Sequence, residues 1–126
     1  MTGGDREIID VLVVDDETGI RATFAEILRS AGYKVAEAED GFVALERLRS
    51  ATVAVMVLDL NMPVLDGWQL LDQLDDPPPV VLVSSRNRGE VQGFQSKISL
   101  YLQKPVRPDS LLEAVGEAMR GGAGTK

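Results

Sequence analysis

The sequence predicts an α/β fold, in which a single domain forms a doubly wound sheet of five parallel strands with helices on both faces. Short apolar runs alternate with segments of helical periodicity along the 126 residues, a length that fits one domain. The first, third and fourth runs are apolar at consecutive positions, as expected of strands that helices cover on both sides. Right-handed crossovers between five strand–helix units then produce a doubly wound sheet.

The first strand is expected over residues 8–14 and the second over residues 33–38. The helix between them presents one buried face, because its apolar residues recur at helical spacing. Those residues are Ile20, Phe24, Ile27, Leu28 and Ala31. Gly32 suits the left-handed position that commonly ends a helix.

The middle of the chain repeats this alternation. Asp40 is expected to cap the second helix, whose apolar positions are Phe42, Leu45 and Leu48. The third strand ends at Leu58, and the fourth covers residues 80–83. The third helix, over residues 68–74, is short because a run of three prolines follows it.

The fourth helix, expected over residues 86–99, has the weakest apolar pattern. Val91, Phe94 and Ile98 form a narrow stripe, whereas Gly89 and Gly93 each cost about 1 kcal/mol in a helix interior. We therefore expect a short or mobile helix there.

The last two elements are a strand over residues 100–103 and a helix that starts near residues 108–110. Ser110 and Glu113 have the spacing of a capping box for that helix. Its expected buried face consists of Leu111, Leu112, Val115 and Met119.

The composition excludes several classes of function. A net charge of −7 argues against a nucleic-acid-binding surface on this domain. The chain has no cysteine, which excludes disulfides and thiolate metal sites, and no histidine, the commonest general base. Any chemistry must therefore depend on carboxylates, hydroxyls and lysine.

No apolar stretch is long enough for a membrane helix, and the first residues lack the apolar centre of a signal peptide. We expect a cytoplasmic protein with no membrane contact. Residues 1–7 are interpreted as an N-terminal tail and residues 8–120 as the domain. Residues 121–126, rich in glycine, are interpreted as a flexible tail or the start of a linker.

Polar residues follow four of the predicted strands: Asp15 and Asp16, then Asp59, then Ser84, then Lys104. The carboxyl ends of parallel strands meet at one edge of the sheet, where ligands bind in open α/β folds. Neighbouring carboxylates repel one another unless a cation is present, and such oxygen ligands suit Mg²⁺. An aspartate at a strand end often has no further role. Four strand ends that converge in this way favour a phosphoryl-transfer site.

This site can work without histidine. A carboxylate is able to attack phosphorus and form an aspartyl phosphate. Phosphoryl transfer depends on charge neutralisation and in-line positioning more than on proton transfer. Mg²⁺, Lys104, the Ser84 hydroxyl and loop N–H groups would provide both.

The motifs around these residues resemble the receiver domain of two-component response regulators. The resemblance runs from about Val11 to Met119. The matching segments are Val13-Val14-Asp15-Asp16, Leu58-Asp59-Leu60-Asn61-Met62-Pro63, Asp66-Gly67, Ser84 and Lys104-Pro105. It implies a flavodoxin-like (βα)5 fold with strand order 2-1-3-4-5. It also implies a phosphoacceptor module whose donor is a histidine kinase or histidine phosphotransfer protein and whose downstream effector is unknown. Such a module is not an enzyme, since it catalyses only its own phosphorylation and slow autodephosphorylation.

The resemblance also implies a role for each site residue. Asp59 resembles the phosphoacceptor, Asp15 and Asp16 the acidic pair that binds Mg²⁺, and Asn61 the residue whose backbone carbonyl completes the coordination. Lys104 resembles the lysine that contacts the phosphoryl group. The switch pair consists of Ser84, which moves to the phosphoryl group, and Tyr101, whose ring turns inward. Pro105 is expected to be cis.

The chain departs from the family pattern at several points. Ser85 stands where alanine is common, the segments on either side of Ser84 are short, and Ile98-Ser99 replaces the usual Gly-Ala. These departures leave open a pseudo-receiver that signals by binding alone. A phosphatase similar to the haloacid dehalogenases is a further alternative. It is disfavoured because that family places its nucleophile at the end of the first strand.

Overall fold

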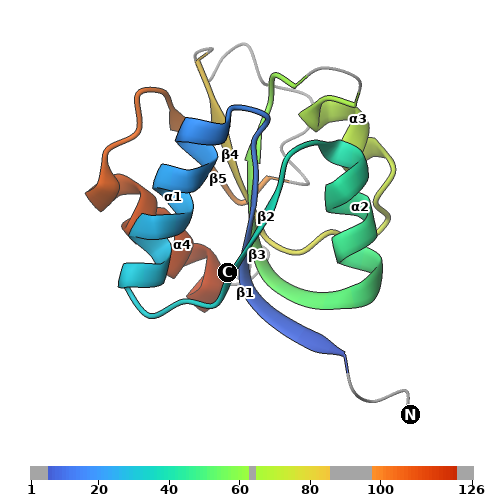
Figure 1. The fold of residues 1–126 in the computed structure, drawn as a ribbon, viewed down its shortest axis with the longest axis horizontal. Coiled ribbons are helices and arrows are strands. Elements are labelled where there is room, and N and C mark those ends of the chain that lie inside the picture. The colour runs from blue at the N-terminus through green and yellow to red at the C-terminus, as the bar shows by residue number, and fades with distance from the viewer. Residues whose placement is uncertain (1–5, 63–64, 86–97, 122–126) are drawn as a thin grey trace.

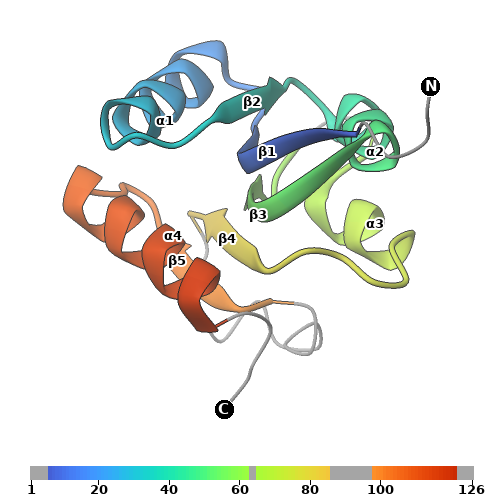
Figure 2. The same cartoon turned by 90° about the horizontal axis from the view of Figure 1, so that it is seen from below.

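The computed structural model describes residues 6–62, 65–85 and 98–121. These residues form three layers, with one sheet between two pairs of helices (Figures 1 and 2). The five strands lie in the order β2-β1-β3-β4-β5, and each neighbouring pair is parallel. Helices α1 and α4 cover one face of the sheet, and α2 and α3 cover the other. The predicted fold class and strand order are confirmed.

The described elements lie close to their predicted positions. The strands are β1 (Glu7–Val14), β2 (Val35–Ala38), β3 (Ala51–Asp59), β4 (Val80–Ser84) and β5 (Leu100–Gln103). The helices are α1 (Thr18–Ser30), α2 (Gly41–Ser50), α3 (Gly67–Asp72) and α4 (Pro108–Gly121). The predicted helix over residues 86–99 lies, except for its last two positions, outside the described residues.

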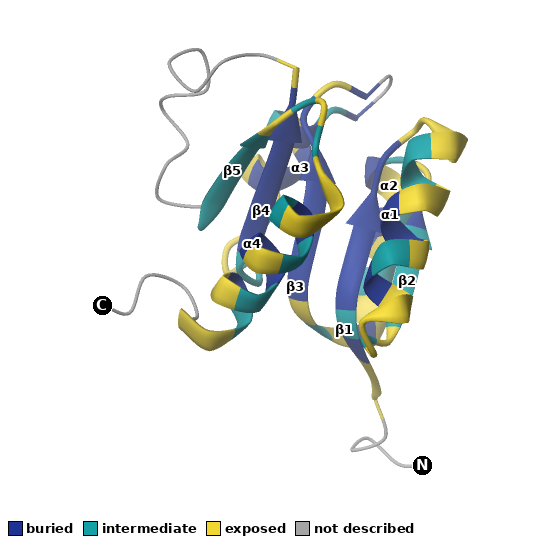
Figure 3. Ribbon diagram, turned by 90° about the vertical axis from the view of Figure 1, so that its left-hand side faces the viewer, coloured by how far each residue is buried: buried dark blue, intermediate teal, exposed yellow. Residues whose placement is uncertain are grey.

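Alternate side chains of the central strands supply two hydrophobic cores, one on each face of the sheet. Leu12, Met56 and Leu82 belong to the core beneath α2 and α3, while Val13, Val57 and Val83 belong to the core beneath α1 and α4. This two-sided burial explains why β1, β3 and β4 read as almost continuous apolar runs. Strand β5 is an exception, because it is an edge strand with β4 as its neighbour. It is half-buried (Figure 3).

The ends of the helices agree with the expected local chemistry in part. The Asp40 carboxylate accepts a hydrogen bond from the Val43 N–H at 2.9 Å, and Gly32 has a φ of 99° after α1, as predicted. The capping box expected at Ser110 is wrong. Helix α4 already begins at Pro108, so Ser110 lies within its first turn. Proline fits that first position because it lacks an N–H and its φ is already helical.

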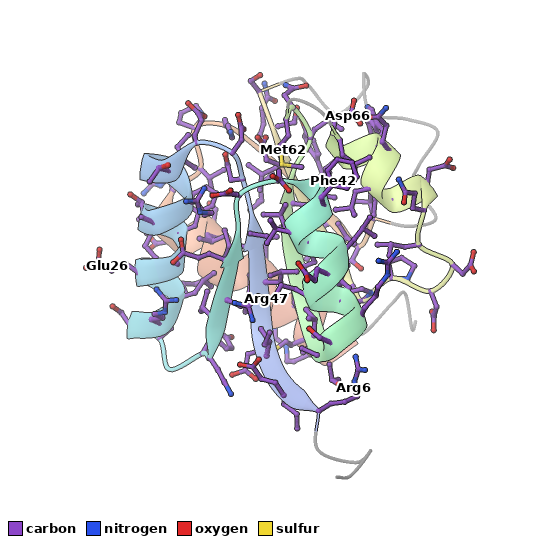
Figure 4. The ribbon with its side chains drawn as sticks, turned by 45° about the vertical axis from the view of Figure 1, so that its right-hand side comes forward. Arg6, Glu26, Phe42, Arg47, Met62 and Asp66 are labelled. Carbon is purple, nitrogen blue, oxygen red and sulfur yellow. The ribbon has the colours of Figure 1, made fainter. Side chains whose placement is uncertain are left out.

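Two expected buried positions are also wrong. Phe42 is 55% exposed in the first turn of α2 (Figure 4), and Ala31 lies beyond the end of α1 and is exposed. The inward positions belong instead to the smaller Ala44 and Ala25. Apolar periodicity finds the buried stripe of a helix, but it does not say whether a residue at its end reaches the sheet.

None of the described helices is long and apolar enough to cross a membrane. The expected cytoplasmic location stays a prediction.

Candidate functional site

The register of the sheet brings the four polar strand ends to one edge. Val14 pairs with Leu58, so the next residues, Asp15 and Asp59, lie side by side on neighbouring strands. Asp59 pairs with Val83, which places Ser84 just beyond it on β4. The Lys104 N–H then donates to the Ser84 carbonyl at 2.8 Å, which holds the start of the next loop beside β4. This carboxyl edge is the top of the molecule in Figure 1.

The Lys104 ammonium lies among three carboxylates. Its Nζ is 3.4 Å from Asp59 Oδ1, 3.7 Å from Asp15 Oδ2 and 3.7 Å from Glu17 Oε1. Asp15 and Asp59 are almost fully buried, at 1% and 3% exposure, whereas the Glu17 side chain is 60% exposed. Two buried carboxylates therefore share one ammonium, and a third approaches it from the solvent side.

Burial controls the ionisation of these groups. Burial, followed by repulsion from Asp15, raises the pKa of Asp59 to about 6, although Lys104 opposes the rise. Burial also raises the pKa of Asp15, against the hydrogen bond from the Glu17 N–H and the charge of Lys104. For Lys104, burial lowers the pKa, but the charges of Asp59, Asp15 and Glu17 together outweigh it and raise the pKa. The site therefore holds more negative charge than it can neutralise with its own residues.

The donor set fits a hard divalent cation. Asp15, Asp16 and Asp59 each offer a carboxylate oxygen, and these oxygens lie within 4.8 Å of one another. Asp15 Oδ2 is buried and accepts no hydrogen bond from the described residues. A buried carboxylate oxygen without a donor is costly unless a cation or water reaches it. Carboxylates grouped in this way are ligands that Mg²⁺ accepts while it keeps several waters.

The acidic loop is held by its backbone. Asp15 Oδ1 accepts a hydrogen bond from the Glu17 N–H at 2.9 Å, and the Arg21 guanidinium donates to the Asp15 carbonyl at 2.8 Å. Arg21 also donates to Glu37 Oε1 at 3.2 Å, which links α1 to β2. These contacts orient the Asp15 carboxylate toward Asp59 and Lys104 without using the carboxylate oxygen that faces the site.

Close packing supports Asp59 from behind. A Cβ placed on Gly67 would lie 2.9 Å from the Asp59 carbonyl oxygen and 3.0 Å from Leu60 Cα, and the Gly67 N–H donates to the Leu60 carbonyl at 2.9 Å. The residue before Gly67, Asp66, caps α3 through a reciprocal capping box with Gln69. Glycine is thus required where α3 meets the end of β3.

The residues assigned to the switch lie on adjacent strands. Ser84 is fully buried at the end of β4, and Tyr101 on β5 packs against the core beneath α2 and α3. The Tyr101 hydroxyl is buried without a hydrogen-bond partner among the described residues. Asn61 is exposed two residues after Asp59, and the Lys104–Pro105 bond is cis, as expected. Pro63, expected to shape the loop, lies outside the described residues.

The sequence and the fold of this chain are similar to those of known proteins. The family model of the response regulator receiver domain matches residues 11–116. The chain belongs to the response regulator receiver domain family. It is thus the receiver domain of a two-component system.

Two curated relatives and two solved structures illustrate the similarity. The receiver is 36% identical over 118 residues to the positive alginate biosynthesis regulatory protein of Pseudomonas aeruginosa, covering 89% of this chain and 48% of that protein. It is 34% identical over 113 residues to the response regulator Rre1 of Synechocystis, covering 83% and 49%. The receiver domain of the Francisella response regulator 1452 matches with a TM-score of 0.80 and 29% identity, covering 89% of this chain and 97% of that one. The chemotaxis response regulator CheY4 of Vibrio cholerae matches with a TM-score of 0.79 and 29% identity, covering 87% and 98%.

The receiver spans about half the length of the curated relatives that it matches. The solved receiver and chemotaxis domains, by contrast, are covered almost completely. The similarity therefore identifies the receiver domain alone. It does not assign to this chain the activities of the longer relatives.

The sequence predicted that Asp15, Asp16, Asp59, Ser84 and Lys104 meet at the carboxyl edge of the sheet. It did not indicate two further residues that contact them. Glu17 contacts Lys104, and Arg21 orders the acidic loop. A signal for Glu17 existed, since it follows Asp15-Asp16 directly. The sequence contained no such signal for Arg21, because an arginine in the first turn of a helix usually faces solvent.

An open groove of about 710 Å³ lies beside the acidic site of the receiver. Apolar side chains of α1, including Ile20 and Phe24, line it together with Val106 from the loop after β5. Glu17 and Lys104 belong to the same lining, so the ion pair between them borders the groove.

Proposed function

We propose that this receiver accepts a phosphoryl group on Asp59 from a phosphohistidine of a kinase or phosphotransfer protein, with Mg²⁺ as cofactor. The observation that carries the proposal is the position of the buried Asp59 carboxylate. It lies 3.4 Å from the Lys104 ammonium and within ligand-sharing distance of Asp15 and Asp16. A carboxylate so placed has a counter-ion and neighbouring metal ligands ready for a phosphoryl group.

The transfer requires no general base. An ionised Asp59 oxygen attacks phosphorus, the P–O bond forms, and the P–N bond of the phosphohistidine breaks with its electron pair on the imidazole. With a pKa of about 6, Asp59 is mostly ionised at neutral pH. Lys104 neutralises charge on the incoming phosphoryl oxygens. Mg²⁺ held by Asp15, Asp16, Asp59 and the Asn61 carbonyl would neutralise the remaining charge and orient the group.

The output would come from a change of conformation. Ser84 donates its hydroxyl to the new phosphoryl group, and Tyr101 takes the space that the movement vacates. The buried Tyr101 hydroxyl without a described partner supports this role, since an unsatisfied polar group favours an alternative packing. Residues 8–120 form the signalling unit, which modifies only itself and acts on an effector of unknown identity.

Intact-mass measurement tests the proposal. Acetyl phosphate or phosphoramidate with Mg²⁺ should add one phosphoryl group that hydroxylamine removes, because acyl phosphates react with that nucleophile. The Asp59→Asn variant should stay unmodified. Asp72→Asn, which removes an exposed carboxylate on α3, is the matched control and should react like the wild type.

Modification of the Asp59→Asn protein would place the phosphoacceptor elsewhere. A wild-type chain that binds Mg²⁺ but takes no phosphoryl group from either donor would favour the pseudo-receiver, which signals by binding alone.

A further inference from the structure

A third carboxylate, Glu17, competes for the ammonium that the proposed phosphoryl transfer needs. Glu17 Oε1 lies 3.7 Å from Lys104 Nζ, while Asp59 Oδ1 lies 3.4 Å from the same atom. Both distances exceed that of a short charge-assisted hydrogen bond, about 2.8 Å. Lys104 is thus shared between the phosphoacceptor, which is the nearer of the two, and Glu17.

We propose that Glu17 is a positioning residue that draws the Lys104 ammonium toward the groove and thereby slows the capture of a phosphoryl group on Asp59. The inference rests on the proposed function of Asp59. It goes further by assigning a restraining role to a residue outside the acidic pair and the switch.

The backbone keeps Glu17 in this position. Its N–H donates to Asp15 Oδ1 at 2.9 Å, and it stands at the N-cap of α1, where its side chain makes no capping hydrogen bond. The Glu17 carboxylate thus does not cap the helix, while the Glu17 backbone is fixed to the acidic loop. The carboxylate therefore lies within reach of Lys104. Glu17 therefore lies in the same loop as the proposed metal ligands and pairs with the same cation as the phosphoacceptor.

Exposure determines the direction of the effect. The Glu17 side chain is 60% exposed and that of Lys104 is 20% exposed, so Glu17 stands on the solvent side of the ammonium. Both residues line the open groove beside the site. Glu17 therefore attracts the ammonium from the solvent side, against the attraction of the buried Asp59 and Asp15, and its negative charge offsets part of the positive charge that an approaching phosphoryl group meets. An exposed ion pair is weak, so the restraint is modest.

Replacement by the neutral isostere tests the proposal. At Mg²⁺ concentrations that saturate each variant, Glu17→Gln should be phosphorylated by acetyl phosphate about two- to five-fold faster than wild type. The affinity for beryllofluoride, followed by NMR titration, should rise by a similar factor because Lys104 can turn fully toward the phosphoryl mimic. This second readout measures binding and requires no chemical step.

Glu26→Gln is the matched control. It removes the same charge from the same helix, and Glu26 lies on the outer side of α1 (Figure 4). Glu26 stands nine positions after Glu17, which is roughly 13 Å along the helix axis and beyond the Debye length of about 8 Å at physiological ionic strength. Its phosphorylation rate should equal that of wild type.

A double-mutant cycle distinguishes an action through Lys104 from simple repulsion of an anionic donor. In a Lys104→Gln background, Glu17→Gln should accelerate modification far less than it does in the wild type. Persistence of the full acceleration in that background would overturn the proposal, as would equal rates for Glu17→Gln and wild type. Failure of the wild type itself to be modified on Asp59 would instead refute the proposed function, and the beryllofluoride titration would then still test the role of Glu17.

Discussion

Replacing Asp59 by asparagine should stabilise the metal-free protein, because the structure buries this carboxylate beside another one. Burial, together with repulsion from Asp15, raises the pKa of Asp59 from 3.8 to about 6. Because each tenfold change in proton affinity corresponds to about 1.4 kcal/mol, the ionised carboxylate costs the folded state about 3 kcal/mol. Asp59 is only 3% exposed, so solvent screens little of this cost, and the shift already includes the opposing attraction of Lys104.

The sign of the pH dependence follows from the raised pKa. The folded protein binds the Asp59 proton more tightly than the unfolded chain does, so this group favours folding when it is protonated. Its contribution is fully present below about pH 4 and is lost as the pH rises through about 6. The gain from Asp59→Asn should therefore be about 3 kcal/mol near pH 8 and roughly half of that near pH 5.

Urea unfolding in the presence of a chelator measures this gain at the two pH values. The wild type, Asp59→Asn and Asp72→Asn should be compared, since Asp72 is an exposed carboxylate whose removal relieves no buried charge. If Asp59→Asn is no more stable than wild type near pH 8, the buried charge of Asp59 does not destabilise the fold. If the gain is the same near pH 5 as near pH 8, the effect comes from packing rather than from ionisation.

Two further substitutions test the proposed metal ligands and the close packing of Gly67 against Asp59. Asp16→Ala should remove Mg²⁺ binding in calorimetry and stabilise the metal-free protein, because it deletes one of three neighbouring carboxylates; undiminished affinity would contradict the assignment of the acidic pair. Gly67→Ala should lower the free energy of unfolding by about 1–3 kcal/mol and slow the modification of Asp59, because the new methyl group would meet the backbone of Asp59 and Leu60. Gly19→Ala is its control: a Cβ there meets nothing within 4 Å, so that helix position should gain up to about 1 kcal/mol in urea unfolding.

Much of the fold could be predicted because local patterns and the global topology agree. The apolar runs of β1, β3 and β4 require cover on both faces, and the strand ends place Asp15, Asp59 and Ser84 at one edge whatever the details of packing. The cap at Asp40 is similarly local, since it depends on contacts three residues apart. Predictions that went wrong concern residues at the ends of elements, such as Phe42 and Ser110, where the position of the neighbouring layer decides burial and the start of the helix.

The sequence by itself determined the chemical groups of the site and the order in which the strands present them. Tertiary structure alone decided the electrostatics. The sequence predicts repulsion among the carboxylates and hence a raised pKa for at least one of them. The sharing of Lys104 among three carboxylates and the burial that raises the pKa of Asp59 in particular cannot be predicted from a one-dimensional pattern, because both depend on distances of a few ångströms and on packing. The same holds for Arg21, whose contact with the Asp15 carbonyl exists because α1 packs beside β2. Coulombic energies change steeply with separation and with the surrounding dielectric, and both are properties of the packed molecule.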